Sequence, residues 1–233
     1  MTTTDNPNLA RLVAVARKLE PLLDELAFVG GCVTGLLVTD PGAAPVRPTL
    51  DVDAIVEVAS YPKFTELEGQ LRSLGFQESH TEGAPICRWV HGELLLDLLP
   101  TDPAILGFSN RWYGSALQNT RPLQIDDLAI RLIAAPYFLA TKLEAFHGRG
   151  KGDYRLSHDL EDVVTVLDGR PEIVSEVQEA AAELRRFLGE EFSALLANRD
   201  FVEALPGYLL PDSTSQQRIG IVVTRIQQII AKA

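Results

Sequence analysis

Two short segments decide the fold of this chain: Phe28-Val29-Gly30-Gly31-Cys32-Val33-Thr34 and Leu50-Asp51-Val52-Asp53-Ala54-Ile55-Val56-Glu57. The first ends a short apolar run with a pair of glycines. The second places two aspartates two residues apart in a run rich in β-branched side chains. Because side chains alternate between the faces of a strand, Asp51 and Asp53 are expected to project from the same face. The apolar residues that follow Asp53 predict a buried strand.

Two carboxylates at this spacing repel each other, and the fold must relieve this repulsion. At about 6 Å and an effective dielectric constant near 20, they repel each other by about 3 kcal/mol. Protonation of one acid, a basic partner, or a divalent cation held by both would each relieve this repulsion. Mg²⁺ takes carboxylate and phosphate oxygens together, so the pair suits nucleotide chemistry. The alternative is that Asp51 and Asp53 end a strand and cap the next turn.

The glycine pair is a candidate phosphate-binding turn. Glycines at the end of a strand let backbone N–H groups approach a phosphate closely, and the start of a following helix adds a favourable dipole. We expect Gly30 and Gly31 to supply the backbone contact, and Cys32 or Thr34 to supply a side-chain contact. The alternative is an ordinary tight turn.

Length and composition indicate a globular protein with one domain or two small ones: 233 residues, 46% hydrophobic and 23% charged. No apolar run has the length of a membrane span, and the first residues lack the pattern of a signal peptide. Cys32 and Cys87 lie far apart without metal-type spacing, which predicts a reducing cytoplasm and excludes a zinc site. The net charge of −11 argues against tight, non-specific binding of nucleic acid.

A third acid, Asp97, lies in a run that otherwise consists of leucine. An unpaired charge would be costly there, so Asp97 either faces a partner or a metal, or lies on the exposed face of an edge strand. Asp102 is the competing candidate, although Thr-Asp-Pro is typical of a turn. The aromatic segment Gly107–Tyr113 suits either base stacking or the anchoring of a loop.

From Asp126 onward the pattern predicts helices only, with Leu123–Ile125 as the last strand. Lys142 lies on a largely apolar helix, and Arg149 lies in a glycine-rich basic loop, residues 147–154, which is not a P-loop because it lacks the Gly-Lys-Ser/Thr ending. Ser157 is expected to cap the next helix, on which Asp159 and Asp162 share a face.

Taken in order, these blocks resemble a known family. Gly30-Gly31 followed by Asp51-Val52-Asp53 is similar to the signature of the DNA polymerase beta-like nucleotidyltransferase superfamily. The later pattern of Lys142, Arg149 and Asp159-x-x-Asp162 resembles that of the AbiEii/AbiGii-like abortive-infection toxins. Together the match spans residues ~28 to ~168. Cys32 departs from the usual Ser or Thr, and the connection from Gly31 to Asp51 is longer than usual, as though a loop were inserted.

The resemblance implies an α/β (α+β) fold in two domains. Residues 1–125 would form a small mixed-sheet nucleotidyltransferase domain with the carboxylates at one edge of the sheet. Residues 126–233 would form an all-helical domain that closes the active-site cleft. The implied activity is the metal-dependent transfer of a nucleoside monophosphate from an NTP, with release of pyrophosphate.

The resemblance also assigns roles to the candidate residues. Asp51, Asp53 and Asp97 would hold two Mg²⁺ ions, with Mn²⁺ as the alternative metal. Asp51, Asp53, Lys142 and Asp159 would be the catalytic residues, with Asp159 orienting Lys142 or acting in the helical half of the site. The implied nucleotide-binding residues are Gly30, Gly31, Cys32, Thr34, Lys142 and Arg149. Asp162 receives no role.

The implied partners are an NTP, an acceptor that is the 3′ end of a tRNA or a protein, and a cognate antitoxin. The protein would then be the toxin of a toxin–antitoxin pair in the cytoplasm, with no membrane contact. Transfer to a small hydroxylated antibiotic is one alternative. Because of Cys32, a catalytically silent nucleotide-binding or antitoxin-like partner protein is the other.

Overall fold

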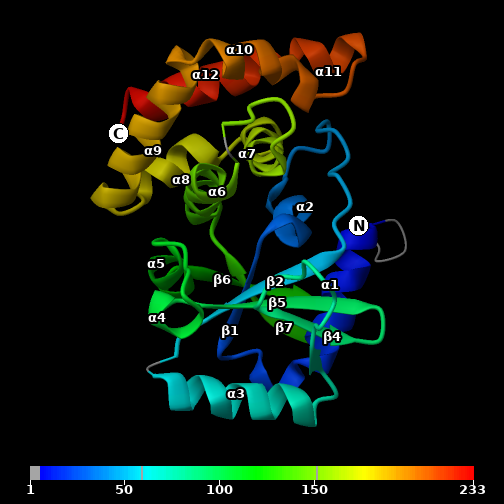
Figure 1. The fold of residues 1–233 in the computed structure, drawn as a ribbon. Coiled ribbons are helices and arrows are strands. Elements are labelled where there is room, and N and C mark those ends of the chain that lie inside the picture. Colours follow the sequence, from blue (N-terminus) through cyan, green and yellow to red (C-terminus); the bar gives the residue numbers. More distant parts are fainter. Residues whose placement is uncertain (1–5, 59, 151) are drawn as a thin grey trace. The chain divides into compact units, whose positions relative to one another are not determined.

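The computed structural model describes residues 6–58, 60–150 and 152–233 (Figure 1). Residues 1–5, where a signal peptide would begin, and Lys151 of the basic loop lie outside this range. Contacts divide the chain into two compact units. The first contains the residues up to Val33 and Arg47–Ala134, and the second contains Thr34–Val46 and Ala135–Ala233. The two predicted domains, with their boundary after residue 125, stay a prediction.

The first unit is built on a mixed sheet with the strand order β3-β4-β5-β2-β1-β7-β6. Its strands are β1 (Leu26–Val29), β2 (Asp51–Val56), β3 (Gln77–Glu78), β4 (Arg88–His91), β5 (Leu94–Pro100), β6 (Thr120–Ile125) and β7 (Leu128–Ile133). β2 runs antiparallel to β1 and parallel to β5, whereas β1 runs parallel to β7. The predicted α/β fold, a mixed sheet followed by helices, is confirmed.

Two details of the predicted sheet were wrong. The acids do not lie at an edge, because β2 and β5 are neighbours in the interior of the sheet, with other strands on both sides. The sheet also continues past Ile125. At Asp126, whose φ is +53°, the chain turns back into β7, which buries Leu128, Ile130 and Leu132 on alternate positions. The run of helices therefore begins at Ala135.

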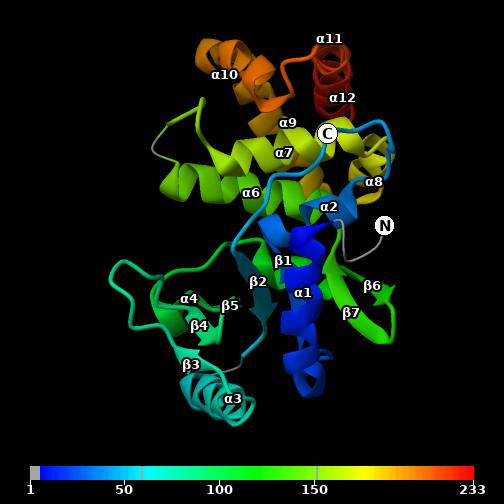
Figure 2. The ribbon, with the colours of Figure 1, turned by 90° about the vertical axis from the view of Figure 1, so that its right-hand side faces the viewer.

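Helices complete the first unit: α1 (Pro7–Lys18), α3 (Tyr61–Ser73), α4 (Pro103–Leu106) and α5 (Tyr113–Gln118), with 3₁₀ turns η1 (Glu20–Leu22) and η2 (Gly31–Val33). α1 begins where the Asn6 side chain accepts hydrogen bonds from the N–H groups of Asn8 and Leu9. Its apolar side lies against β2, β5 and β7 (Figure 2). This packing buries one face of the strands that carry the acids.

The second unit consists of helices in its described part: α2 (Thr34–Leu37), α6 (Ala135–Arg149), α7 (His158–Gly169), α8 (Ile173–Glu179), α9 (Ala182–Ala197), α10 (Arg199–Ala204), η3 (Leu205–Tyr208), α11 (Ser213–Gln217) and α12 (Ile219–Ile230). α6 and α7 pack side by side, and α12 packs against α7, α8 and α9 (Figure 2). The Ser157 side chain accepts a hydrogen bond from the Leu160 N–H, so the predicted N-cap of α7 is confirmed. No helix of residues 6–58, 60–150 and 152–233 is long and apolar enough to cross a membrane.

The inserted segment after Gly31 is bound to the end of α7. The N–H groups of Thr39 and Asp40 both donate to the Gly169 carbonyl, at 2.8 and 2.9 Å. Gly169 permits this approach, since a Cβ there would lie 2.7 Å from Val38. Arg218 joins Asp40 to Asp168, with both N–O distances at 2.7 Å. The segment is therefore a part of the helical unit.

Candidate functional site

The first candidate cluster lies on β2 and β5, where three acids are brought together by strand register. Asp53 on β2 is paired directly with Asp97 on β5, and Asp51 lies one alternation back on the same face of β2. Asp97 is 6% exposed. Asp102, the competing candidate, caps α4 by accepting a hydrogen bond from the Ala104 N–H at 2.8 Å. The geometry thus brings Asp97, and not Asp102, to Asp51 and Asp53.

Sequence reasoning missed Arg88, which completes this cluster. Arg88 on β4 lies directly opposite Asp97 in the antiparallel pairing of β4 and β5. Its Nε donates to Asp97 Oδ1 at 2.7 Å, and its Nη2 donates to Asp97 Oδ2 at 2.7 Å and to Asp51 Oδ2 at 2.6 Å. A basic partner was one of the three arrangements that relieve the repulsion between the acids. The residues around Arg88 do not indicate that it is this partner, since its position opposite Asp97 depends on the register between β4 and β5.

The pKa values of Asp51 and Arg88 are shifted in the directions that favour their charged forms. Burial alone would raise the pKa of Asp51, but hydrogen bonds from the Thr49 hydroxyl and Arg88, with the charge of Arg88, lower it below the usual value. The hydrogen bond to Asp97 raises the pKa of Arg88, with further help from the charges of Asp97 and Asp51. Burial, with the nearby charges of Asp97 and Asp53, raises the pKa of the Cys87 thiol to about 12. Cys87 is therefore a neutral thiol at physiological pH.

The donor chemistry of the cluster fits a cation. Carboxylate oxygens are the ligands that Mg²⁺ prefers, and Asp51 and Asp97 already converge on one positive group, the Arg88 guanidinium. In the present side-chain arrangement, however, no group of three or more His, Cys, Asp or Glu in the described part of the chain is placed to hold a metal ion. Arg88 occupies the position between Asp51 and Asp97.

Gly30 is required beside this cluster. It follows β1 with φ at +73°, a conformation that side chains rarely adopt, and a Cβ at this position would lie 1.8 Å from Asp53 Oδ2. Because Val29 is paired with Asp53 in the sheet, the turn at Gly30 passes directly over that carboxylate. The glycine therefore makes room for the acid, in addition to any contact that its backbone makes with a ligand.

The Gly30→Ala substitution is expected to lower the free energy of unfolding by about 2 kcal/mol or more, because it adds both backbone strain and a clash with Asp53. Urea denaturation followed by circular dichroism measures the change. The matched control is Gly69→Ala in α3, where a Cβ meets nothing within 4 Å. This control is expected to stabilise the protein by about 0.5–1 kcal/mol. Equal stability of the Gly30→Ala variant and the unsubstituted protein would contradict the argument.

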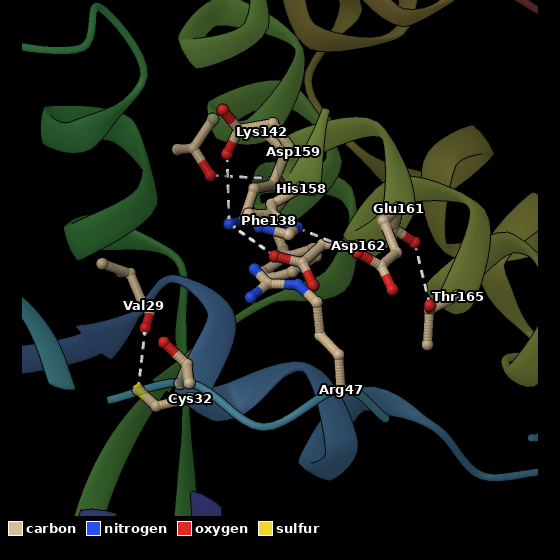
Figure 3. Close-up of polar contacts among 12 residues, drawn as sticks. Val29, Cys32, Arg47, Phe138, Lys142, His158, Asp159, Glu161, Asp162 and Thr165 are labelled. Atoms are coloured by element: carbon tan, nitrogen blue, oxygen red, sulfur yellow. Dashed lines mark hydrogen bonds and ion pairs between the residues drawn. The ribbon is translucent and has the colours of Figure 1, made fainter. Parts of the chain in front are cut away.

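The side chains of Cys32 and Thr34 both point inward. Cys32 is 2% exposed and its Sγ donates to the Val29 carbonyl at 3.3 Å (Figure 3). The Thr34 hydroxyl is buried and finds no hydrogen-bond partner among the described residues. Gly31 is buried in η2. The predicted phosphate contacts of Cys32 and Thr34 stay predictions, and in this arrangement it is the backbone of the turn that can reach a ligand.

The second candidate cluster lies on α6 and α7 of the helical unit. Lys142 Nζ is 2.6 Å from Asp162 Oδ2 and 3.3 Å from Asp159 Oδ1 (Figure 3). Arg149 donates from Nε and Nη2 to the two oxygens of Asp159, at 2.9 and 2.7 Å. Lys142, Asp159 and Asp162 are 6%, 5% and 1% exposed. The structure thus brings together four residues that the sequence pattern singled out, and gives Asp162 the shortest contact with Lys142.

This second cluster holds its charges in place. Burial would raise the pKa of Asp159, but Arg149 and Lys142 outweigh it and lower the pKa. Asp159 is therefore an anion that fixes two cations, while the Arg149 side chain remains 71% exposed. Lys142 and Arg149 both lie on α6, Arg149 as its last residue and not in a loop as expected, and the acids of α7 hold them in place.

The aromatic residues in the segment 107–113 differ in how deeply they are buried. Trp112 is 5% exposed, and its backbone N–H donates to the Asn110 Oδ1 at 3.1 Å. Arg111 lies over the Trp112 ring, 5.4 Å from its centroid. Phe108 is 43% exposed. Trp112 therefore anchors the loop, whereas Phe108 has the exposure that a stacking residue needs.

No protein-family model and no curated protein matches this sequence. Solved structures do match. An antigenic nucleotidyltransferase-like protein from Paracoccidioides brasiliensis has a TM-score of 0.53 and 22% sequence identity, over 84% of this chain and 91% of that one. JHP933 from Helicobacter pylori matches with a TM-score of 0.48 and 14% identity, over 97% of this chain and 93% of that one, and is too remote to support an inference. The chain therefore has the fold of a nucleotidyltransferase-like protein. At these identities the likeness shows the fold alone.

Proposed function

We propose that this protein is a nucleotidyltransferase that moves a nucleoside monophosphate from an NTP to an acceptor hydroxyl and releases pyrophosphate. The observation that carries the proposal is the convergence of Asp51 and Asp97 on one cationic group, beside the Gly30 turn, in a chain with this fold. Acids on neighbouring strands are suited to nucleotide chemistry because their carboxylates can bind a divalent cation, and that cation can in turn bind phosphate oxygens.

Asp51, Asp53 and Asp97 are the residues that would hold Mg²⁺, or Mn²⁺ in its place. When bound, the metal supplies positive charge that lowers the pKa of an acceptor hydroxyl and neutralises the triphosphate. The sheet contributes by fixing the acids. The pairing of Asp53 with Asp97 sets their separation, and Gly30 allows the backbone to pass close to Asp53. The N–H groups of the Gly30–Gly31 turn are the proposed contacts for phosphate oxygens.

Lys142 and Arg149 are the proposed cations that neutralise charge on the transferred and leaving phosphates. Asp159 and Asp162 position Lys142 between them.

For the acceptor, we propose the 3′ end of a tRNA or a protein, in the setting of a toxin controlled by an antitoxin, as the resemblance to AbiEii/AbiGii-like toxins implies. A net charge of −11 disfavours loose electrostatic capture of RNA, so the acceptor must be presented specifically. A small hydroxylated antibiotic is the alternative acceptor. The two cysteines are free thiols, which supports placing the protein in the reducing cytoplasm.

One observation favours a second candidate function. Arg88 is placed between Asp51 and Asp97, where the proposed transfer needs a metal, so the alternative is a nucleotide-binding or partner-binding protein that does not turn over. The enzyme and the silent binder differ in one outcome only: whether the label from an NTP becomes covalently attached to an acceptor.

The test is a reaction of purified protein with Mg²⁺ and each α-³²P-labelled NTP in turn, in parallel with total tRNA, a cell lysate or an aminoglycoside as acceptor. Label in a tRNA, protein or antibiotic fraction identifies both the nucleotide and the class of acceptor. Nucleotide binding by calorimetry without label in any fraction would favour the silent binder and overturn the proposed transfer.

A further inference from the structure

We propose that Arg88 is an exchangeable internal cation, which a divalent metal must displace before it can bind Asp51 and Asp97. The choice of a free divalent cation as the ligand rests on the proposed function. The displacement of Arg88 is argued from the geometry of the acidic cluster. It assigns a role to a residue that the nucleotidyl-transfer proposal leaves without one.

Each oxygen of the two acids accepts a hydrogen bond. Arg88 takes both oxygens of Asp97 and one oxygen of Asp51. The remaining oxygen of Asp51 accepts a hydrogen bond from the Thr49 hydroxyl at 2.7 Å. The guanidinium lies between the two acids, so a metal ion that bridges them would have to take its place, and the charges of the two cations repel each other. A metal that bridges Asp51 and Asp97 therefore displaces the guanidinium.

Arg88 is held by strong hydrogen bonds, but its side chain is still partly exposed to solvent. A guanidinium that bonds a carboxylate with two parallel N–H groups makes a strong, oriented ion pair, and Arg88 adds a bridge to a second acid. The backbone positions of all three residues are fixed by strand pairing. The Arg88 side chain is nevertheless 19% exposed and that of Asp51 is 31% exposed, so the cluster reaches solvent on one side.

The first test measures metal affinity and not activity. Mn²⁺ and Mg²⁺ are titrated by calorimetry into the nucleotide-free protein and into an Arg88→Gln variant. Because the variant has no competing cation, it is expected to bind Mn²⁺ about tenfold more tightly, or better. Equal or weaker binding by Arg88→Gln would overturn the proposal, as would the absence of metal binding from both proteins.

Two variants serve as controls. Arg17→Gln removes another arginine that bonds an aspartate in the same unit, Asp127, at 3.1 and 2.6 Å, but at an exposed site, so it is expected to leave Mn²⁺ affinity unchanged. A general effect of lost positive charge would tighten Mn²⁺ binding in Arg17→Gln as well, and would overturn the proposal. Asp97→Asn is expected to abolish the gain when combined with Arg88→Gln.

A second measurement uses the unsubstituted protein, because Arg88→Gln leaves two acids without their cation and reduces stability. The Nε–H signal of Arg88 in a ¹H–¹⁵N spectrum, assigned by its loss in Arg88→Lys, is followed during Mg²⁺ titration. It is expected to shift with the same midpoint as the calorimetric binding, because the bond to Asp97 Oδ1 is broken. Metal binding that leaves this signal unchanged would overturn the proposal. Label transfer by the same preparation shows separately whether the proposed enzymatic function stands.

Discussion

Replacing Lys142 with methionine is expected to lower the free energy of unfolding by about 3–5 kcal/mol, the usual cost of removing one partner of a buried ion pair. Lys142 is 6% exposed and lies between Asp162, at 2.6 Å, and Asp159, at 3.3 Å. Asp159 keeps Arg149 as a partner, but Asp162, at 1% exposed, loses the cation closest to it. Urea denaturation at neutral pH measures the difference.

The matched control for this prediction is the double variant Lys142→Met/Asp162→Asn. Because asparagine carries no charge, the double variant is expected to recover part of the stability that the single variant loses. A single variant within about 1 kcal/mol of the unsubstituted protein would mean that the pair contributes no more than an exposed salt bridge, and would contradict the burial argument.

The second large effect concerns the acids of the sheet. The double substitution Asp51→Asn/Asp53→Asn is expected to reduce nucleotidyl transfer by about 10³-fold or more, since it removes the negative charges proposed to hold the metal while preserving side-chain size. The measurement is the initial rate of label transfer at saturating NTP. Loss of Asp51 also removes one bond to Arg88, so the folded fraction of the variant is checked by its melting curve.

Asp102→Asn is the control for this substitution. Asp102 caps α4 through a hydrogen bond to the Ala104 N–H, and asparagine caps a helix about as well as aspartate does. The control is therefore expected to keep its activity. Full transfer activity in the Asp51→Asn/Asp53→Asn variant would remove the acidic cluster from the mechanism, whereas loss of activity in Asp102→Asn would show that the assay responds to general destabilisation.

The sequence contained the local parts of the site. Alternation along a strand placed Asp51 and Asp53 on one face, and helical spacing placed Asp159 and Asp162 on one face, because both features depend on residues that are near in the chain. Asp97 was recognised because a charge within a leucine run needs a partner. These features are encoded in the backbone geometry of single elements.

The features that could not be predicted from the sequence depend on pairing between segments that are distant in the chain. Arg88 reaches Asp97 only because β4 and β5 are in one particular register, and nothing in the residues around Arg88 specifies that register. β7 was missed because Ala129 and Arg131 are weak markers of its outward face, and its apolar residues lead directly into α6. The interior position of β2 follows from β1 and β7 adding on its other side, which is again a tertiary property.

The proposed activity of this protein is the attachment of the α-phosphate of an NTP to an acceptor. The most direct measurement compares α-³²P- and γ-³²P-labelled NTPs in parallel reactions with the acceptor fractions, using the unsubstituted protein and the Asp51→Asn/Asp53→Asn variant. Label is expected to enter the acceptor from the α position only, with γ label recovered as pyrophosphate, and the variant is expected to transfer neither. Label from the γ position, or α label that persists in the variant, would contradict the proposed activity.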